Sequence, residues 1–260
     1  MKIISYNING IRSVIRKGFQ SWISNINPDV LCLQEIKATH EQIDINLFYK
    51  LGYYCYWFPS KKKGYSGVAI LSKKKPFCIK YGMDLEIIDK EGRILCIDLY
   101  LNNKEKISII SLYLPSGNDM KNRLNFKLFF MKKFFMYIKN FEDNKKNLII
   151  CGDYNICHSE IDINDPIKNE NISGFLKEER KWMTNFIKLG FIDSFRHYIK
   201  KSGHYSWWNY RFNSRKYNKG WRIDYILISV FLKKYMKNAY LLPYVKYSDH
   251  CPMVLELNID

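Results

Sequence analysis

Ser248-Asp249-His250-Cys251-Pro252-Met253 lies close to the C-terminus, and Trp221-Arg222-Ile223-Asp224-Tyr225 precedes it on a predicted strand. The two stretches complete an ordered series of polar residues, each at the end of a short apolar run or in the loop after it. Strand ends converge on one rim of a sheet, where residues distant in sequence meet. Carboxylates, amides and an imidazole at such a rim suit phosphodiester hydrolysis with a divalent metal. The earlier members are Asn7, Gln34-Glu35, Tyr113 and Gly152-Asp153-Tyr154-Asn155.

Short apolar or β-branched runs between turn residues predict the strands. They lie near 2–7, 30–34, 53–58, 67–72, 77–81, 94–101, 107–114, 147–152, 223–228 and 254–259. Apolar residues at helical spacing predict helices near 12–25, 41–51, 120–142, 177–189 and 230–236. The Met/Phe stripe of the helix near 120–142 is typical of packing against a sheet rather than of a cofactor site.

No linker or composition break divides the chain, so we expect residues 1–260 to form a single domain. Lys2–Gly10 resembles Lys106–Gly117, since each is a strand followed by a polar residue and a glycine turn, and each leads to a helix. Two similar halves that each contribute a sheet would pack in layers. The expected fold is therefore α/β: a four-layered α/β sandwich of two packed mixed β-sheets flanked by helices.

The composition points to a folded, basic protein. Hydrophobic residues make up 47% and aromatic residues 16% of the 260 residues, which supports a large core and excludes a disordered chain. The net charge of +17 and the pI of about 9.4 favour polyanionic partners. AT-rich coding, which enriches Lys, Asn, Ile and Tyr, is an alternative origin of that charge.

The cysteines indicate a reducing compartment. There are seven, an odd number, and they are scattered without a C-x-x-C pair, which favours buried thiols over disulfides or a zinc site. The most apolar stretch, 124–141, is interrupted by four lysines and is too short and charged to span a bilayer. The chain opens on a strand without a targeting segment, so we expect a cytoplasmic, bacterial-type protein with no membrane partner.

Two motifs could supply oxygen ligands or a base. Glu35 follows the buried strand Val30–Leu33, and a carboxylate held there by a rigid core suits Mg²⁺; the alternative is an ordinary surface glutamate. In Gly152–Asn155 the glycine permits a tight turn. Asp153 could then orient or deprotonate water, while Asn155 donates to a phosphoryl oxygen. The same four letters also occur as a common turn.

The most specific constellation joins Asp224 to His250. An imidazole near a phosphate needs a second group that fixes its tautomer and favours its cationic form, and Asp224 can provide it. Tyr113 could be a core residue, but Pro115-Ser116-Gly117 forms a turn that would direct its hydroxyl into the cleft.

The segments 205–212 and 220–223 interleave aromatic residues with cations. Aromatic faces accept sugars or unstacked bases, and the cations bind phosphates. Alternatively, some of the aromatic residues belong to the core, and Trp208 and Tyr210 are expected to be buried. The interleaved cations are Arg211, Arg215, Lys216, Lys219 and Arg222.

The whole series resembles the exonuclease III/AP endonuclease family of DNA repair enzymes, within the DNase I-like endonuclease/exonuclease/phosphatase superfamily. His158, Ile161-Asp162 and Trp207-Trp208 bring the resemblance closest to the branch of the principal human AP endonuclease. The resemblance covers essentially the whole chain in order. The motifs that carry it are 7–12, 33–37, 152–155, 174–180, 193–196, 221–225 and 248–252.

The resemblance implies a Mg²⁺ site, with Mn²⁺ as an alternative, in which Glu35 is the main ligand. Its metal set is Asn7, Glu35, Asp153, Asn155, Asp249 and His250. Its catalytic set, which activates water, holds the phosphate and stabilises the transition state, is Tyr113, Asp153, Asn155, Asp224 and His250. Its set for binding DNA and the abasic sugar is Arg12, Lys37, Trp207, Arg211, Trp221 and Ile223. Asn9 stands where some relatives carry an aspartate near the metal.

The function implied is that of a class II AP endonuclease of base excision repair. The enzyme would act on double-stranded DNA containing abasic sites, cutting 5′ to the site to leave a 3′-hydroxyl. We also expect 3′-phosphodiesterase and 3′→5′ exonuclease activity, and a monomer. One alternative is another phosphodiesterase of the superfamily, such as a general Mg-dependent DNase or a lipid phosphatase. The other is a basic DNA-binding protein on an inactive nuclease scaffold, although no Glu, Asp or His of the series is missing.

Overall fold

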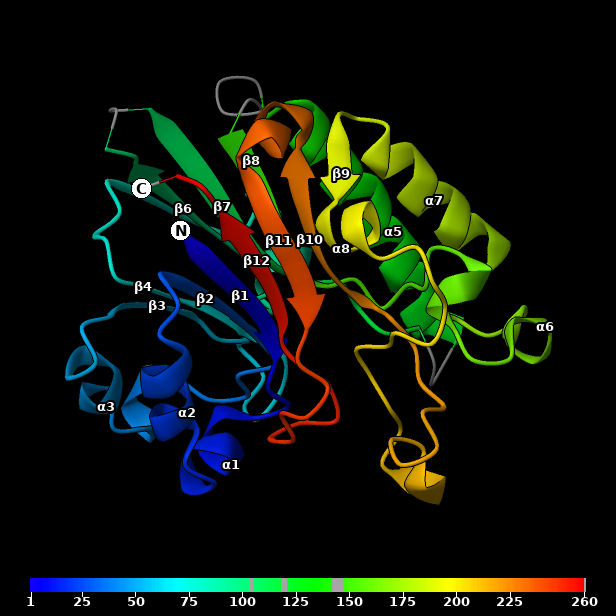
Figure 1. Ribbon diagram of the computed structural model, residues 1–260, viewed down its shortest axis with the longest axis horizontal. Helices are drawn as coiled ribbons and strands as arrows, with labels where there is room; N and C mark the ends of the chain where they lie inside the picture. Colours follow the sequence, from blue (N-terminus) through cyan, green and yellow to red (C-terminus); the bar gives the residue numbers. More distant parts are fainter. Residues whose placement is uncertain (103–104, 118–120, 142–146, 260) are drawn as a thin grey trace.

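The computed structural model describes residues 1–102, 105–117, 121–141 and 147–259. Two six-stranded mixed sheets pack face to face, with helices on both outer sides (Figure 1), which confirms the four-layered α/β sandwich. Sheet A contains, in spatial order, β11 (Met236–Leu241), β12 (Met253–Leu257), β1 (Lys2–Asn7), β2 (Val30–Gln34), β4 (Val68–Ser72) and β3 (Tyr54–Phe58). Sheet B contains β5 (Cys78–Tyr81), β6 (Ile94–Tyr100), β7 (Lys106–Tyr113), β8 (Leu148–Asp153), β10 (Asp224–Ser229) and β9 (Phe191–Asp193).

The two sheets have the same topology. In each, the central pair is parallel (β1 with β2, β7 with β8) and every other pairing is antiparallel. The strands β1, β2, β3 and β4 of sheet A take the places that β7, β8, β9 and β10 take in sheet B. This equivalence confirms the structural similarity expected between Lys2–Gly10 and Lys106–Gly117.

The helices cover the outer faces. Figure 1 shows α1, α2 and α3 beside sheet A, and α5 and α7 beside sheet B. Within the described residues, no helix is long and apolar enough to cross a membrane. The helices are α1 (Ile11–Arg16), α2 (Phe19–Ile26), α3 (Asn46–Tyr49), α4 (Glu86–Asp89), α5 (Lys121–Lys139), α6 (Pro166–Asn169), α7 (Lys177–Ile187) and α8 (Ser194–Tyr198). Short 3₁₀ turns are η1 (His40–Gln42), η3 (Glu160–Asp162), η4 (Arg211–Asn213) and η5 (Val230–Tyr235).

The central strands are apolar on both faces because both faces are buried. In β7, Ile109 packs between the sheets, whereas its neighbour Ile110 packs outward with Phe130 and Phe134 of α5. This two-residue alternation follows from the pleat of the strand. Burial of each such side chain stabilises the fold by about 1.5–3 kcal/mol relative to exposure, so the strand ends are held on a rigid frame.

Several predicted elements differ from the structure. The helix predicted at 12–25 divides into α1 and α2, because Gly18 adopts a left-handed conformation with φ of 84°. The segment 230–236 forms the 3₁₀ turn η5 rather than an α-helix, and 41–51 is helical only in η1 and α3. Residues 120 and 142, the predicted ends of the long helix, lie outside the described residues. The strands β9 and β11 were missed, since one is three residues long and the other is an edge strand with exposed positions.

The polar series gathers at one rim of the sandwich. β1, β2, β7 and β8 end there, and the start of β10 meets the end of β8, with Asp224 opposite Asp153 in the register. The expectation that every member follows an apolar run is therefore wrong for Asp224, which begins its strand. The antiparallel pairing brings it to the same rim.

Candidate active site

Three side chains at this rim form a candidate metal centre. Ligand atoms of Glu35, Asp153 and His250 all lie within 4.8 Å of one another. The Nδ2 of Asn7 donates to Glu35 Oε1 at 2.8 Å and to Asp153 Oδ2 at 2.9 Å, so it joins a residue of sheet A to one of sheet B. The two carboxylates are hard ligands that fit a cation such as Mg²⁺. Asn7 would add its amide oxygen only after its amide turned over, because Oδ1 accepts a 3.0 Å hydrogen bond from the N–H of Asn9.

Glu35 is prepared to carry a negative charge. It follows β2 with a positive φ of 52°, and its Oε2 lies 2.8 Å from the Lys37 Nζ. Burial alone would raise the pKa of Glu35, but the charge and hydrogen bond of Lys37, the Asn7 amide and the charge of His250 lower it below its usual value. The carboxylate is thus available to a metal, which would compete with Lys37 for it.

Asp153 has the opposite tendency. Its Oδ1 accepts a 2.8 Å hydrogen bond from the backbone N–H of Asn155, which has a positive φ of 51°. Burial, together with the charges of Asp224 and Glu35, raises the pKa of Asp153 to about 7, although His250 and the Asn155 N–H lower it. A carboxyl group that titrates near neutral pH is well matched to proton transfer from water.

This shift predicts a pH-dependent cost to stability. An unfolded aspartate ionises near pH 4, so in the metal-free protein the unfavourable ionisation of Asp153 should appear between about pH 4 and pH 7 and persist above it. Asp153→Asn should therefore raise the Tm at pH 8 in EDTA by several degrees, since 1 kcal/mol shifts Tm by roughly 2–4 °C at this size. It should change Tm little at pH 4. Thermal melts of the wild type, of Asp153→Asn and of the exposed-site control Asp165→Asn test this prediction. Equal Tm values for Asp153→Asn and the wild type at pH 8 would contradict it.

Asp224 and His250 form the predicted dyad. Asp224 Oδ2 lies 2.8 Å from His250 Nδ1, and His250 Nε2 faces Asp153 Oδ2 at 3.9 Å. Burial lowers the pKa of His250, but Asp224, Asp153 and Asp249 together raise it to about 10. The ring is therefore an imidazolium at neutral pH, with an Nε2–H donor directed into the site. That form has no lone pair for a metal, so the charge favours the phosphate-binding role of His250 over its predicted metal-ligand role.

The carboxylate of Asp249 already accepts hydrogen bonds from three side chains. Its carboxylate accepts hydrogen bonds from Asn9 Nδ2 at 2.9 Å, Trp207 Nε1 at 3.0 Å and Ser248 Oγ at 3.0 Å. Burial raises the pKa of Asp249, but His250 and these three donors lower it overall. In this arrangement Asp249 fixes the orientation of Trp207, and any contact with a metal would require it to release a donor.

Tyr113 is both core and site. It is only 8% exposed, and the Arg93 guanidinium lies 4.4 Å from its ring centroid. Burial, the charge of Glu35 and its hydrogen bond to Glu35 raise the pKa of Tyr113 well above its usual value, so its hydroxyl remains a neutral donor. Both alternatives considered for this tyrosine therefore hold together.

The carboxylates line a pocket that has one apolar wall. Trp207 and Trp221 meet edge to face with centroids 5.9 Å apart, and Ile223 packs beside them. The same pocket is lined by Glu35, Asp153, Asn155 and His250. Its wall includes Gly174, where a Cβ would approach the Trp221 ring to 2.6 Å and φ is 101°. Glycine is required there because any side chain would push the tryptophan aside.

The sequence matches the endonuclease/exonuclease/phosphatase family over residues 4–250. The chain belongs to this family. Within it, an exodeoxyribonuclease of Bacillus subtilis (strain 168) is 40% identical over 261 residues and is covered completely, as is this chain. The DNA repair nuclease APEX1 of Danio rerio is 35% identical, with 100% of this chain and 83% of that protein covered. An AP endonuclease from Archaeoglobus fulgidus superposes with a TM-score of 0.89 at 28% identity, with 99% of each chain covered.

These relatives confirm the resemblance to the exonuclease III/AP endonuclease group and identify the chain as a nuclease of DNA repair. The geometry brings together the predicted residues of the metal, catalytic and pocket sets. It leaves the predicted DNA-binding residues Arg12 and Arg211 exposed, apart from that cluster, while Lys37 is paired with Glu35.

The aromatic and basic segment of this family member divides between core and surface. Trp208 is buried, as expected, whereas Tyr210 is 70% exposed, which contradicts the expectation for it. Arg215 stacks on Trp208 at 4.6 Å and donates to the carbonyls of Val245 and Ser248. It therefore ties down the segment that carries Asp249 and His250 instead of presenting its charge to a phosphate.

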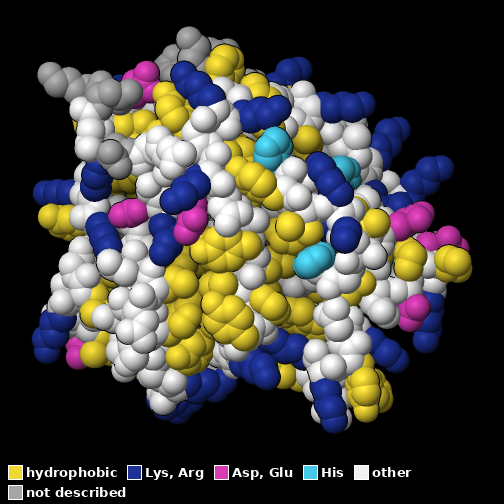
Figure 2. Space-filling view, in the orientation of Figure 1, with side chains coloured by type: hydrophobic (Ala, Val, Ile, Leu, Met, Phe, Trp, Pro, Cys, Tyr) yellow, Lys and Arg dark blue, Asp and Glu magenta, His cyan; other side chains and the backbone are white. Residues whose placement is uncertain are grey.

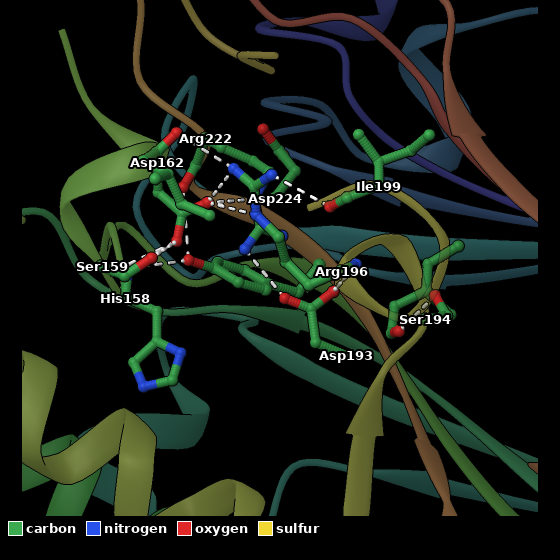
Figure 3. Close-up of polar contacts among 12 residues, drawn as sticks. His158, Ser159, Asp162, Asp193, Ser194, Arg196, Ile199, Arg222 and Asp224 are labelled. Carbon is green, nitrogen blue, oxygen red and sulfur yellow. Dashed lines mark hydrogen bonds and ion pairs between the residues drawn. The ribbon is translucent and has the colours of Figure 1, made fainter. Parts of the chain in front are cut away.

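Arg222 was also interpreted as a phosphate-binding cation, but it is completely buried. Its guanidinium pairs with Asp162 at 2.6 Å and with Asp193 at 2.8 Å, and Asp162 also pairs with Arg196 at 2.6 Å (Figure 3). Because Arg222 lies between Trp221 and Ile223 in sequence, this network holds the backbone of the pocket. Its position between two apolar residues, next to the strand predicted at 223–228, was the one available sign of burial, and a charge buried there needs partners such as Asp162 and Asp193.

Proposed function

We propose that this protein is a class II AP endonuclease that hydrolyses the phosphodiester bond 5′ to an abasic site and leaves a 3′-hydroxyl. The observation that carries the proposal is that the carboxylate and imidazolium cluster lines the same pocket as Trp207, Trp221 and Ile223. A pocket with one apolar wall beside these charged groups suits a baseless sugar, which leaves the duplex at little cost because no base pair is lost.

The chain's own groups divide the reaction among them. Asp153 would take the proton of the attacking water, because its buried carboxylate is oriented by the Asn7 amide and the Asn155 N–H. The His250 Nε2–H and the Tyr113 hydroxyl would donate to phosphoryl oxygens as negative charge develops. Glu35, Asn7 and Asp153 would hold Mg²⁺, or Mn²⁺ in its place, and the ion would supply Lewis-acid polarisation of the phosphate.

The surface supports a duplex DNA substrate. Figure 2 shows Lys and Arg side chains spread widely over one face around an apolar centre, and the net charge is +17. Such a field attracts DNA through its phosphates. We further propose that the protein is a monomer and that residues 1–260 form a single domain. It would work in a reducing compartment such as the cytoplasm. All seven cysteines are free, in keeping with that compartment.

The decisive experiment compares a duplex carrying one stable abasic analogue with the same duplex intact and with a recessed 3′ end. We expect Mg²⁺-dependent incision 5′ to the analogue, faster than internal cutting of intact duplex by about a hundredfold or more, and slower removal of 3′ nucleotides. EDTA should abolish each activity. Equal internal cutting of both duplexes would favour a general DNase. Predominant 3′ digestion would favour an exodeoxyribonuclease, the activity named for the Bacillus relative.

A further inference from the structure

A buried ion pair lies in the wall of the pocket, where Lys127 is one of the lining residues. Lys127 of α5 and Glu179 of α7 are both 0% exposed, and Lys127 Nζ is 2.5 Å from Glu179 Oε1. Desolvating two charges is costly, so such a pair adds little net stability compared with well-packed apolar side chains. Lys127 also interrupts the apolar stripe of its helix. Both facts point to a positional role.

Glu179 binds four donors and no acceptor. Its Oε1 accepts from Lys127 Nζ and from Ser173 Oγ at 2.9 Å. Its Oε2 accepts from the backbone N–H groups of Gly174 at 2.6 Å and Leu176 at 3.0 Å. Only a carboxylate can satisfy all four, since an amide would turn an N–H group toward some of these donors. The charge of Glu179 therefore fixes the loop 173–176.

That loop is a wall of the pocket. Gly174 packs against the Trp221 ring, and its carbonyl accepts a 2.7 Å hydrogen bond from the N–H of Cys157. On its other side, the Lys127 ammonium donates to the carbonyl of Asn155 at 2.7 Å. The ion pair thus connects the wall at Gly174 to the turn that carries Asp153 and Asn155. We call Lys127 and Glu179 the 127–179 brace.

We propose that the 127–179 brace sets the selectivity of the enzyme for a baseless sugar over an intact nucleotide. The inference rests on the proposed function. Glu179 does not line the pocket itself; it acts by holding Gly174 close to Trp221, so that the pocket stays too narrow for a sugar that carries a base. Release of the loop would widen the pocket, weaken the fit to the abasic sugar and admit intact nucleotides.

Glu179→Gln tests the proposal. The readout is the ratio of abasic incision to removal of 3′ nucleotides from intact duplex, measured on one preparation so that the folded fraction cancels. We expect this ratio to fall by about tenfold or more, because misplacing a binding group by about 1 Å can cost up to 10²-fold, with a higher KM for the abasic duplex. Glu179→Asp keeps the charge but is one methylene too short, and provides the same comparison if the glutamine variant does not fold.

Asp89→Asn is the matched control. Asp89 also accepts two backbone hydrogen bonds, from Met83 at 3.0 Å and Leu85 at 2.8 Å, but it lies outside the pocket. The ratio of abasic incision to removal of 3′ nucleotides should be the same for Asp89→Asn as for the wild type. An unchanged ratio in the Glu179 variants, or an equal fall in the control, would overturn the role of the brace. Failure of the wild type to incise the abasic duplex would instead overturn the proposed function.

Discussion

Glu35→Ala is expected to lower the rate of abasic incision by roughly a thousandfold while changing affinity for the duplex only slightly. Glu35 is the carboxylate whose pKa is lowered within the candidate metal centre, so its loss should remove the main hard ligand. Polarisation by a metal is worth several kcal/mol, and about 4 kcal/mol corresponds to a thousandfold in rate. Single-turnover incision at saturating enzyme, with affinity measured by fluorescence anisotropy, separates the two effects.

The control for charge is Glu41→Ala, which removes an exposed carboxylate on η1. It should cleave at the wild-type rate, whereas a titration with Mn²⁺ should show weaker binding only for Glu35→Ala. Cleavage by Glu35→Ala within tenfold of the wild type in ordinary Mg²⁺ would show that Glu35 is not the principal ligand.

The second large effect concerns Asp224 and His250. Asp224→Asn should keep the fold but remove the charge that raises the pKa of His250. His250→Asn removes the imidazolium itself. Loss of one donor aimed at the developing negative charge typically costs on the order of 10²–10³ in rate, and we expect each variant to fall in that range.

The double variant distinguishes a coupled pair from two separate contributions. Because the two side chains share a 2.8 Å hydrogen bond, the combined loss should be far smaller than the product of the single losses. Multiplicative losses on an abasic duplex would mean that the two residues act independently. The pH profile adds a check, because Asp224→Asn should shift the alkaline limb of the activity toward lower pH.

The expectation that polar residues at strand ends meet at one rim agrees with the strand register. Strands were readable because both faces of the sheets are buried, which leaves continuous apolar runs with polar residues where each run stops. The similarity in sequence between Lys2–Gly10 and Lys106–Gly117 indicated that the sheet is duplicated. The Asp224–His250 pair could be inferred because an imidazole near a phosphate requires a carboxylate, and Asp224 on a predicted strand supplied the candidate.

The buried ion pairs of Lys127 and Arg222 could not be predicted. Lys127 and Glu179 are 52 positions apart and lie on different helices, and a lysine in an amphipathic pattern normally belongs to a solvated face. Arg222 was misinterpreted for the same reason, since its partner Asp162 is 60 positions away. Sequence periodicity describes which face a residue occupies, whereas burial of a charge depends on the counter-charge that the fold brings to it.

The matched topology of the two sheets has a consequence for how the chain could be rearranged. Sheet B is built from six consecutive strands, but sheet A is completed by β11 and β12, of which β12 pairs with β1 and so joins the two ends of the chain. The amino group of Met1 donates to the carbonyls of Leu257 and Ile259, both at 2.8 Å. A circular permutant could join these ends and begin instead between β4 and β5. Its first six strands would then form sheet B and its last six would form sheet A, in the same order of pairing. In the present connectivity, fraying of the β1–β12 seam would loosen Asn7 and His250 together, so the seam that joins the ends of the chain also supports its chemistry.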